Sequence, residues 1–266
     1  MRWTTVIRLA KSYSLHRVGK CTVCGKRSLF LAGNLPDRSQ MRESLLCVWC
    51  RSSSRKRHVA LGLMQHFGLP LTSLAENRGA LMQRKLYSAS ANEPIYRAIG
   101  EGNPNYIASE FFPDVPAGKQ KGGVLCQNLE CLTFPNSAFD AVITEDVLEH
   151  VRNWHQAVRE IARVLKPAGV HIFTVPLCLD RPTVERVRFS GEAVEYLLPP
   201  EYHGDPLRGE ILAYRNFGID LLEHLRSVGF ETKLLLSSYH DMLRFGIADS
   251  IVLISKKLGE PACESG

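Results

Sequence analysis

The sequence contains no apolar segment long enough to cross a lipid bilayer. A transmembrane helix needs about 20 consecutive apolar residues, and the best candidate, residues 169–179, is short and interrupted by polar residues and a proline. Near the N-terminus, Arg8 and Lys11 stand where a secretory signal peptide needs an unbroken apolar stretch. We therefore expect no membrane span and a cytoplasmic protein.

Acidic residues are scarce in the first 60 residues, where 13 lysines and arginines accompany only two acidic residues. The rest of the chain has 20 basic and 25 acidic residues, so the formal charge of +6 combines a strongly basic N-terminal part with a mildly acidic remainder. Such segregation of charge indicates two units with different tasks. Hydrophobic residues make up 45% of the 266 residues, which excludes a wholly disordered chain.

The eight cysteines do not suggest a disulfide framework, because four of them form two Cys-x-x-Cys pairs. Cys21 and Cys24 are separated from Cys47 and Cys50 by 22 residues. Two such pairs can place four thiolates tetrahedrally around Zn²⁺, and Gly25 tolerates the positive φ that the first turn would need. We predict a structural zinc site that supplies much of this segment's folding energy. Two redox dithiols, or unrelated free thiols, are the alternative.

A basic run, residues 51–58, follows the second cysteine pair and leads into a predicted helix over 59–68. Its charges could contact nucleic-acid phosphate, a phosphorylated substrate or the acidic part of the chain. The simpler interpretation is a solvated start of the helix. No ladder of aromatic residues accompanies the charges, so stacking of single-stranded bases is not supported.

From residue 84 onward the chain alternates between predicted strands and helices. The strands are expected over residues 84–90, 105–112, 122–127, 139–145, 170–175, 231–238 and 249–257, and the helices over 92–101, 146–151, 153–166 and 218–230. This alternation predicts an α/β fold with a mostly parallel, seven-stranded sheet covered on both faces. Ligands of such folds bind at the carboxyl ends of the strands.

Residues 129–176 contain the motifs FPNSAFD, VLEHV and REIARVLKPAG around the fourth and fifth predicted strands. They resemble the central block of class I S-adenosylmethionine-dependent methyltransferases, in the broad type 11 group that is similar to the ubiquinone-biosynthesis methyltransferases. The resemblance extends over about residues 84–256 and implies a Rossmann-like fold. The expected division is a basic zinc-ribbon-like element over 1–60, a helical linker over 61–83 and a methyltransferase-like domain over 84–266.

The resemblance implies S-adenosylmethionine as cofactor. The residues that it assigns to the cofactor are Ser88, Ala89, Ser90, Glu110, Asn128, Leu129, Glu145 and Asp146. The first loop lacks the usual glycines, and its Cβ atoms restrict positive φ. Glu110 would accept two hydrogen bonds from the ribose hydroxyls, whereas Glu145 and Asp146 would either face the sulfonium or cap the following helix.

Methyl transfer from a sulfonium needs aligned reactants and, for many oxygen or nitrogen acceptors, a general base. His150 and His203 are the candidate bases, each with a packing role as the alternative. His203 lies in a long insertion, residues 177–216, which is typical of a substrate lid. Three arginines of this segment, Arg181, Arg186 and Arg188, would either receive an anionic acceptor or pair with Glu185, Glu192 and Glu195.

The leading hypothesis is a methyltransferase that acts on a small, glycan-like or anionic acceptor. The four-cysteine element together with the PEYHGDP loop resembles bacterial methyltransferases, some of which accompany glycan-building enzymes. One alternative is a nucleic-acid or protein methyltransferase that uses the basic N-terminal part. Another is a degenerate methyltransferase fold that serves as a binding module. The sequence does not indicate an oligomeric state.

Overall fold

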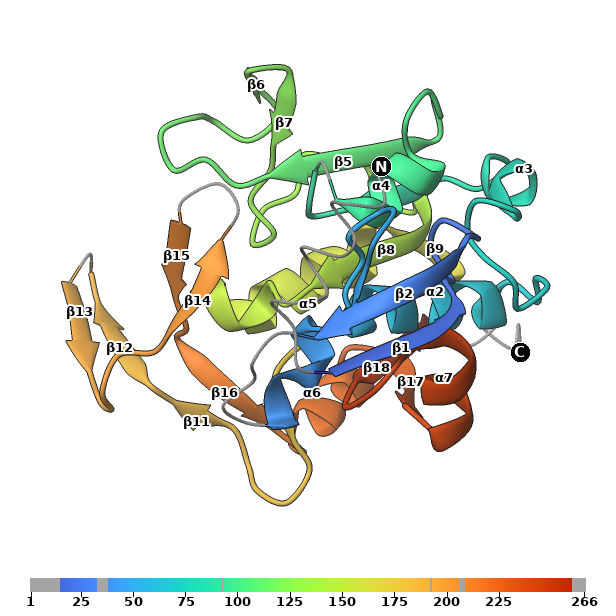
Figure 1. Cartoon of the computed structure of the whole chain (residues 1–266). Helices are drawn as coiled ribbons and strands as arrows, with labels where there is room; N and C mark the ends of the chain where they lie inside the picture. The colour runs from blue at the N-terminus through green and yellow to red at the C-terminus, as the bar shows by residue number, and fades with distance from the viewer. Residues whose placement is uncertain (1–14, 33–37, 92, 192, 206–208, 260–266) are drawn as a thin grey trace, which may run out of the picture. The chain divides into compact units, whose positions relative to one another are not determined.

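The computed structural model describes residues 15–32, 38–91, 93–191, 193–205 and 209–259 (Figure 1). The chain divides into two compact units. Unit 1 comprises Met1–Ala108 and Lys233–Ile254, and unit 2 comprises Ser109–Thr232 and Ser255–Gly266. The predicted three-part division of the chain stays a prediction. No helix in the described part of the chain is long and apolar enough to cross a membrane.

The main sheet has eight strands in the order β17-β18-β9-β8-β4-β5-β7-β6. The strands are β4 (Leu86–Ser88), β5 (Tyr106–Glu110), β6 (Gln120–Lys121), β7 (Val124–Cys126), β8 (Phe139–Glu145), β9 (Leu165–Thr174), β17 (Phe230–Leu236) and β18 (Ile251–Lys257). The pairs β4–β5, β5–β7 and β8–β9 are parallel, and the two-residue β6 pairs antiparallel with β7. Without β6 this is the predicted seven-stranded sheet, and the Rossmann-like fold class is confirmed.

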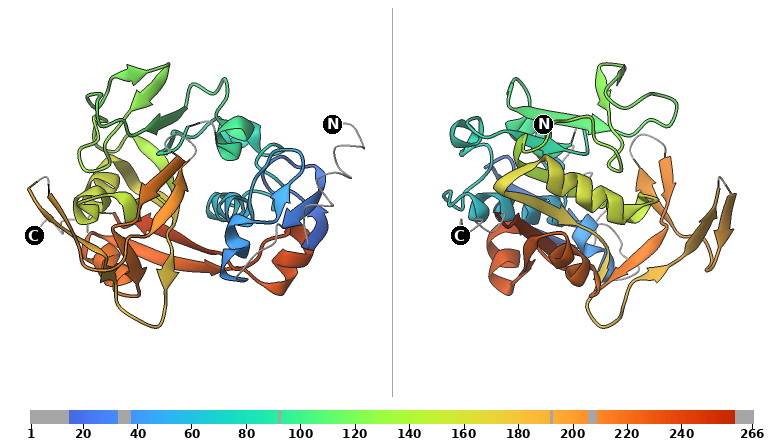
Figure 2. Two further views of the ribbon diagram at one scale, coloured as in Figure 1. Left: turned by 60° about the vertical axis from the view of Figure 1, so that its left-hand side comes forward. Right: turned by 180° about the vertical axis from the view of Figure 1, so that it is seen from behind.

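Strands β8 and β9 form the core of unit 2 together with helix α5 (Trp154–Val164). Six of the seven residues of β8, and the last six residues of β9, are buried, because both faces of these strands are covered. Helix α5 turns its apolar face inward, including Val158 and Ile161, and lies along the two strands in both views of Figure 2.

Helix α5 ends two residues before the predicted Lys166. Leu165 is already extended, with φ −75° and ψ 136°, and begins β9. Pro167 opposes a longer helix, because it has no amide for the carbonyl of Arg163, four residues before it, and its ring would clash with that carbonyl. Lys166 instead forms an ion pair of 2.9 Å with Asp140 of β8.

The insertion after β9 consists of short strands in unit 2. These are β10 (Leu177–Cys178), β11 (Val184–Glu185), β12 (Val187–Ser190), β13 (Ala193–Tyr196), β14 (Tyr202–Asp205), β15 (Gly209–Leu212) and β16 (Arg215–Gly218). Strands β12–β13 and β14–β15 form two antiparallel hairpins, while β16 lies between β10 and β11 (Figure 1). Helix α6 (Leu221–Ser227) follows, and Gly229 beyond it has the positive φ of 91° that a helix C-cap favours.

Unit 1 begins with a three-stranded antiparallel sheet in the order β1-β2-β3. It also contains β4, parts of β5, β17 and β18, and several helices. The elements of this part are β1 (Leu15–Lys20), β2 (Arg27–Ala32), η1 (Arg38–Glu43), β3 (Leu46–Cys47), α2 (Ser54–His66), α3 (Arg78–Leu81), α4 (Pro94–Ile99) and α7 (Tyr239–Phe245). Ser53 caps α2 by accepting a hydrogen bond from the amide of Lys56.

The basic run at the start of α2 is not solvated, so the simpler sequence interpretation is wrong. The side chains of Arg55, Arg57 and His58 are buried. The Arg57 guanidinium donates to four carbonyl oxygens at 2.5 to 2.8 Å, those of Leu45, Ser52, Phe245 and Gly246. It also lies 4.0 Å from the centroid of the Phe30 ring. Arg57 therefore joins the cysteine-bearing segment to the end of α7.

We expect Arg57→Met to lower the free energy of unfolding by about 3–5 kcal/mol, because four buried carbonyls lose their donor. Urea unfolding measures the change. Arg17 is exposed on β1, and Arg17→Met as the control should change stability by less than about 0.5 kcal/mol. Equal effects of the two substitutions would contradict the assigned role of Arg57.

The buried His171 of β9 should make the free energy of unfolding depend on pH. Its ring is fully buried, and this burial lowers its pKa from 6.5 to about 3. Above pH 6.5 the imidazole is neutral in both the folded and the unfolded state, so protonation of His171 does not lower the free energy of unfolding there. Between pH 6.5 and about 3 only the unfolded state takes up the proton, and stability falls by up to about 1.4 kcal/mol per pH unit.

We expect His171→Gln to reduce this fall when urea unfolding is compared at pH 7 and pH 5. His240 is exposed, and His240→Gln should leave the slope of the wild-type protein unchanged. A His171→Gln protein with the wild-type slope would show that another group causes the pH dependence.

Candidate active site and metal centre

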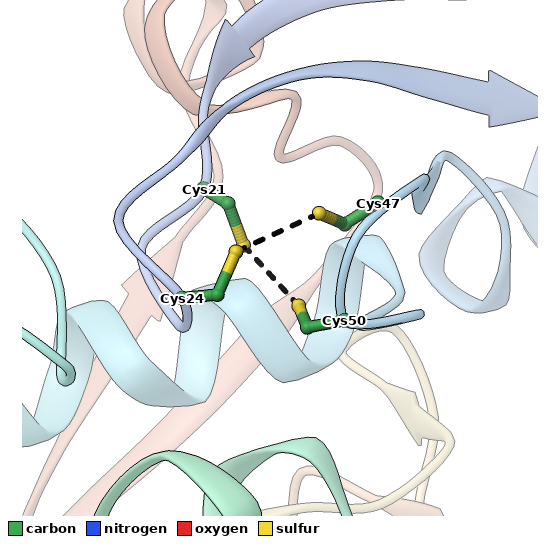
Figure 3. Close-up of side chains that lie close together, drawn as sticks. All are labelled: Cys21, Cys24, Cys47 and Cys50. Atoms are coloured by element: carbon green, nitrogen blue, oxygen red, sulfur yellow. Dashed lines mark hydrogen bonds between the residues drawn. The ribbon is translucent and has the colours of Figure 1, made fainter. Parts of the chain in front are cut away.

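The four cysteines of the two Cys-x-x-Cys pairs converge in unit 1 (Figure 3). Their sulfur atoms all lie within 4.8 Å of one another, with Cys21 and Cys50 at 3.7 Å and Cys24 and Cys47 at 3.9 Å. A tetrahedral zinc ion with Zn–S bonds of about 2.3 Å requires sulfur–sulfur distances of about 3.8 Å. The donor set and its spacing therefore fit Zn²⁺.

The two cysteine pairs have the same backbone turn. The amide of Gly25 donates to the Cys21 carbonyl, and the amide of Arg51 donates to the Cys47 carbonyl, both at 2.9 Å. Gly25 has a φ of 76°, as the sequence predicts, and Arg51 has a φ of 64°. Each pair thus needs the left-handed conformation at the residue after its second cysteine.

The proximity of the sulfurs also changes their acidity. A hydrogen bond from Cys24 lowers the pKa of Cys21 to about 6, and the same contact raises the pKa of Cys24. A hydrogen bond donated by Cys21 likewise lowers the pKa of Cys47, whereas the contact with Cys21 raises the pKa of Cys50. The thiolate, which is the form that binds a metal, is thus favoured at Cys21 and Cys47.

The first predicted cofactor loop lies at the end of β4 in unit 1. Ser88 is buried and its hydroxyl donates to the carbonyl of Ser90 at 3.2 Å, while Ala89 and Ser90 are half-buried. Among the described residues with a positive φ, none belongs to this loop. The described residues of this loop therefore need no glycine for their backbone conformation.

The other predicted cofactor residues lie at the carboxyl ends of strands in unit 2. Glu110 is the last residue of β5, and its carbonyl accepts from the amide of Gln127, next to Asn128. The Asn128 side-chain oxygen accepts from the amide of Glu130 at 2.9 Å, and Leu129 is buried. The structure thus brings Glu110 and Asn128 to neighbouring strand ends.

Glu145 and Asp146 follow at the end of β8. Glu145 is buried, and Asp146 has a φ of 53° while its amide donates to the carbonyl of Thr174. The next helix, η2 (Leu148–His150), has Val147 at its N-cap and no side-chain cap. The N-cap position of η2 is therefore occupied by neither acid, and the roles of Glu145 and Asp146 stay a prediction.

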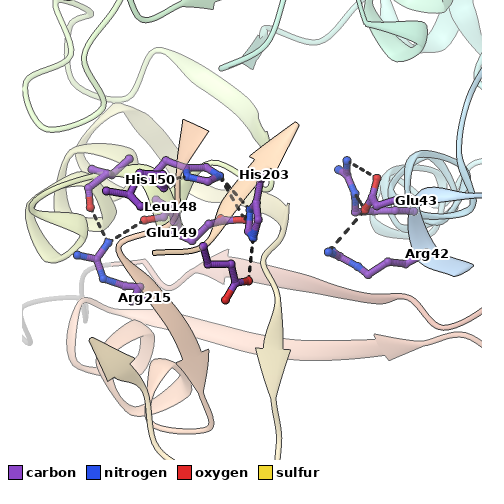
Figure 4. Close-up of polar contacts among 11 residues, drawn as sticks. Arg42, Glu43, Leu148, Glu149, His150, His203 and Arg215 are labelled. Carbon is purple, nitrogen blue, oxygen red and sulfur yellow. Dashed lines mark hydrogen bonds and ion pairs between the residues drawn. The ribbon is translucent and has the colours of Figure 1, made fainter. Parts of the chain in front are cut away.

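The two predicted bases, His150 and His203, meet in unit 2 (Figure 4). His150 Nε2 lies 3.2 Å from His203 Nδ1. Glu149 Oε1 lies 3.9 Å from the first and 3.7 Å from the second of these nitrogens. On the other side of His203, Nε2 lies 3.2 Å from Glu201 Oε1. We call Glu149, His150 and His203 the carboxylate–histidine cluster.

Glu201 completes the surroundings of His203. Burial opposes ionisation of its carboxyl group, but the hydrogen bond with His203 and the charge of Arg186 together lower its pKa. Arg186 lies 3.1 Å from Glu201 and also donates to Asn216. Glu201 is thus an anion that accepts hydrogen bonds from both sides.

Neighbouring backbone holds the carboxylate–histidine cluster in place. The Arg215 guanidinium donates to the carbonyls of Leu148 at 3.1 Å and Val151 at 2.5 Å, and it pairs with Glu185 at 2.9 Å. Arg215 is only 3% exposed. The amide of Tyr214 donates to the Glu149 carbonyl. The bonds to Val151 and Glu149 satisfy carbonyls at the end of the short helix, whereas the Leu148 carbonyl also accepts from the Val151 amide within the turn.

The sequence analysis missed Glu149 and Arg215 as site residues. Glu149 belongs to the VLEHV motif but was not separated from the ordinary polar residues of a helix. For the arginines of the insertion, the pairing alternative holds with partly different partners. Arg188 pairs with the predicted Glu195, whereas Arg181 pairs with Asp180 and Arg186 with Glu201.

Comparison with known families identifies part of this architecture. Residues 106–173 match the family model of a methyltransferase domain, Methyltransf_11. The match covers β5 to β9 and includes Glu110, Asn128, Glu145 and His150. It confirms the resemblance to class I methyltransferases that the sequence motifs indicate. No curated protein matches the chain.

Solved methyltransferases have similar folds at low sequence identity. A 1,6-didemethyltoxoflavin N1-methyltransferase of Burkholderia thailandensis, with S-adenosylhomocysteine bound, is 14% identical over 87% of this chain and 96% of its own, with a TM-score of 0.43. A methyltransferase of Methanosarcina mazei is 18% identical over 66% of this chain and 93% of its own, with a TM-score of 0.38. A methyltransferase of Haloferax volcanii in complex with its activator is 13% identical over 79% of this chain and 99% of its own, with a TM-score of 0.40. Such scores indicate no substrate.

The two cysteine turns offer a matched pair of substitutions. Gly25→Ala should lower the free energy of unfolding by about 1–2 kcal/mol, because alanine is strained at positive φ, and its Cβ would lie 2.8 Å from the Ser73 hydroxyl. Arg51→Gly relieves the same strain and should raise stability by less than about 1 kcal/mol. Urea unfolding of zinc-equilibrated protein measures both. Changes of the same sign would contradict the shared turn geometry.

Proposed function

We propose that the chain, which carries a class I methyltransferase domain, transfers a methyl group from S-adenosylmethionine to a small acceptor of glycan-like or anionic chemistry. The match of residues 106–173 is the observation that carries this proposal. The arrangement of Glu110 and Asn128 at neighbouring strand ends supports it, because ligands of doubly wound folds bind at this edge of the sheet.

Individual roles follow from the resemblance and from the contacts of each residue. Bound S-adenosylmethionine supplies a methyl group activated on a sulfonium sulfur. Glu110 accepts hydrogen bonds from the ribose hydroxyls. Asn128 and Leu129 contact the adenine, and Glu145 and Asp146 lie toward the sulfonium. The small side chains of Ser88, Ala89 and Ser90 allow the backbone to approach the methionine part.

The acceptor is activated at the carboxylate–histidine cluster. An acceptor hydroxyl or amine attacks the methyl carbon in line with the departing sulfur, and its proton must leave for a base. His203 is the better placed base of the pair, because its side chain is 26% exposed whereas that of His150 is 8% exposed. Glu201 stabilises the positive charge that His203 gains.

The four cysteines hold a structural Zn²⁺ in this proposal. The 3.7 and 3.9 Å sulfur–sulfur distances support it, and so does Arg57, because a four-thiolate zinc site carries a net negative charge that a buried guanidinium offsets. Arg57 bonds to the backbone on both sides of the second cysteine pair, at Leu45 and Ser52. The metal and this arginine together order the N-terminal part of unit 1.

A nucleic-acid substrate is less well supported, because three basic side chains of the N-terminal part already have acidic partners within the chain. Lys20 pairs with Glu76 at 2.8 Å, Lys56 with Glu93 at 2.7 Å and Arg55 with Glu43 at 2.6 Å. Phosphate binding requires accessible positive charge. These ion pairs favour a small acceptor over a polyanion.

Isothermal titration calorimetry with S-adenosylmethionine tests the proposal. The wild-type protein should bind the cofactor, and Glu110→Gln should weaken binding about 10- to 100-fold, because hydrogen bonds to a charged group contribute about 1.5–3 kcal/mol. Asp114 is an exposed acid just after β5, paired with Lys121, and Asp114→Asn serves as the control with unchanged affinity. Absence of binding by folded, zinc-equilibrated wild-type protein would overturn the proposed function and favour the degenerate binding module.

A further inference from the structure

The carboxylate–histidine cluster has the donor set of a metal site. Glu149 Oε1, His150 Nε2 and His203 Nδ1 all lie within 4.8 Å of one another, at separations of 3.2, 3.7 and 3.9 Å. Ligand atoms about 2.0–2.1 Å from a tetrahedral ion lie about 3.3 Å apart. One cation between these three atoms would therefore need only small movements of the side chains.

The hydrogen bonds of the two imidazoles determine which nitrogens can bind a cation. His150 Nδ1 lies 2.8 Å from the carbonyl oxygen of Leu212, which can only accept, so Nδ1 carries the hydrogen and Nε2 carries the lone pair. His203 Nε2 faces the Glu201 carboxylate, so its hydrogen lies there and Nδ1 carries the lone pair.

Two nitrogen lone pairs thus face each other at 3.2 Å beside a carboxylate oxygen. Neutral imidazoles in these tautomers repel each other, so the arrangement needs a positive charge between them. Metal-binding histidines usually donate their second nitrogen to a carbonyl or carboxylate, which fixes the tautomer and the ring orientation. Leu212 and Glu201 provide both kinds of partner.

The surrounding backbone is already organised for binding. Arg215 and Tyr214 hold the turn that carries Glu149 and His150, and the β14–β15 hairpin places His203 opposite Ile211. Glu149 is fully buried, whereas the His203 side chain is 26% exposed. A cation held here would thus be fixed from one side and reached by solvent from the other.

We propose that Glu149, His150 and His203 bind a divalent transition-metal cation. Imidazole nitrogens favour Zn²⁺, Fe²⁺ or Ni²⁺ over Mg²⁺ and Ca²⁺. Three protein ligands leave at least one coordination position for water or another oxygen ligand. This site is separate from the four cysteines, since it shares no residue with them.

A bound cation changes the chemistry of the acceptor, and this part of the inference rests on the proposed function. A His203 that binds the cation has no lone pair left to accept a proton, so in the metal-bound protein it does not act as the base described above. The cation instead lowers the pKa of an acceptor hydroxyl that occupies its open position. The hydroxyl proton then leaves to solvent, and the acceptor oxygen attacks the methyl carbon while the carbon–sulfur electron pair goes to sulfur.

The zinc content of the full-length protein tests the site. Protein stripped with a chelator, equilibrated with Zn²⁺ and desalted should hold two zinc ions per chain, and the double variant His150→Ala/His203→Ala should hold one fewer. The matched control is His155→Ala/His224→Ala. The Nδ1 atoms of these two rings also lie 3.1 Å apart in the same unit, but no described carboxylate joins them in a three-ligand group. The control should keep the wild-type zinc content.

Cobalt distinguishes the two sites within one chain. The first equivalent of Co²⁺ should produce the intense thiolate charge-transfer band of the cysteine site. The second should add visible bands without any further charge transfer, and this second signal should disappear in Glu149→Gln and His203→Gln. Circular dichroism and thermal unfolding identify variants that fail to fold, and His203→Gln, at a partly exposed position, keeps the test informative.

An equal zinc content in the wild-type protein and the His150→Ala/His203→Ala variant would overturn the proposal and leave the pair as a proton-sharing dyad. A cobalt spectrum with only the charge-transfer signal would do the same. Neither measurement uses S-adenosylmethionine, so loss of the metal site and loss of cofactor binding are distinguishable outcomes.

Discussion

The candidate chemistry of this protein depends on the buried guanidinium of Arg215. It donates to the carbonyls of Leu148 and Val151 at the two ends of the η2 turn, and the adjacent Tyr214 amide donates to the carbonyl of Glu149. Without these donors the carbonyls of Glu149 and Val151 would lose these partners, since a single 3₁₀ turn cannot bond its own last residues. Because the turn is held from outside, Glu149 and His150 keep one orientation toward His203, which the insertion supplies.

In unit 1 a buried arginine, Arg57, likewise donates to backbone carbonyls near the four cysteines. Arg57 donates to carbonyls from two distant parts of the chain, residues 45–52 and 245–246. Burial lowers its pKa to about 10, which still leaves the side chain charged at neutral pH. In both units a buried arginine satisfies the backbone of the segment that carries the candidate ligands.

Local patterns in the sequence predict most of the fold and one of the two clusters. Strand β8 has the predicted bounds 139–145, because its apolar residues and flanking turn are adjacent in sequence. The cysteine site is predictable because the Cys-x-x-Cys spacing within each pair is typical of the turn that brings two sulfur atoms together. Helix α5 ends early at Val164 because Pro167 opposes a longer helix.

Long-range contacts explain what the sequence does not reveal. The acceptors of Arg57 at Phe245 and Gly246 are 188 and 189 residues away, so its charge looks like that of a solvated helix start. His150 and His203 were each recognised as candidates, but they are 53 residues apart, and only the folded insertion brings them to Glu149. A hydropathy pattern does not indicate which distant polar side chains come into contact in the folded chain.

Anomalous X-ray diffraction on both sides of the zinc absorption edge tests the central claim most directly, with crystals of the zinc-equilibrated full-length protein. We predict two zinc peaks per chain, one among the four sulfurs and one between the carboxylate of Glu149 and the facing nitrogens of His150 and His203. A single peak at the cysteines, with the two imidazoles in direct contact, would contradict the claim.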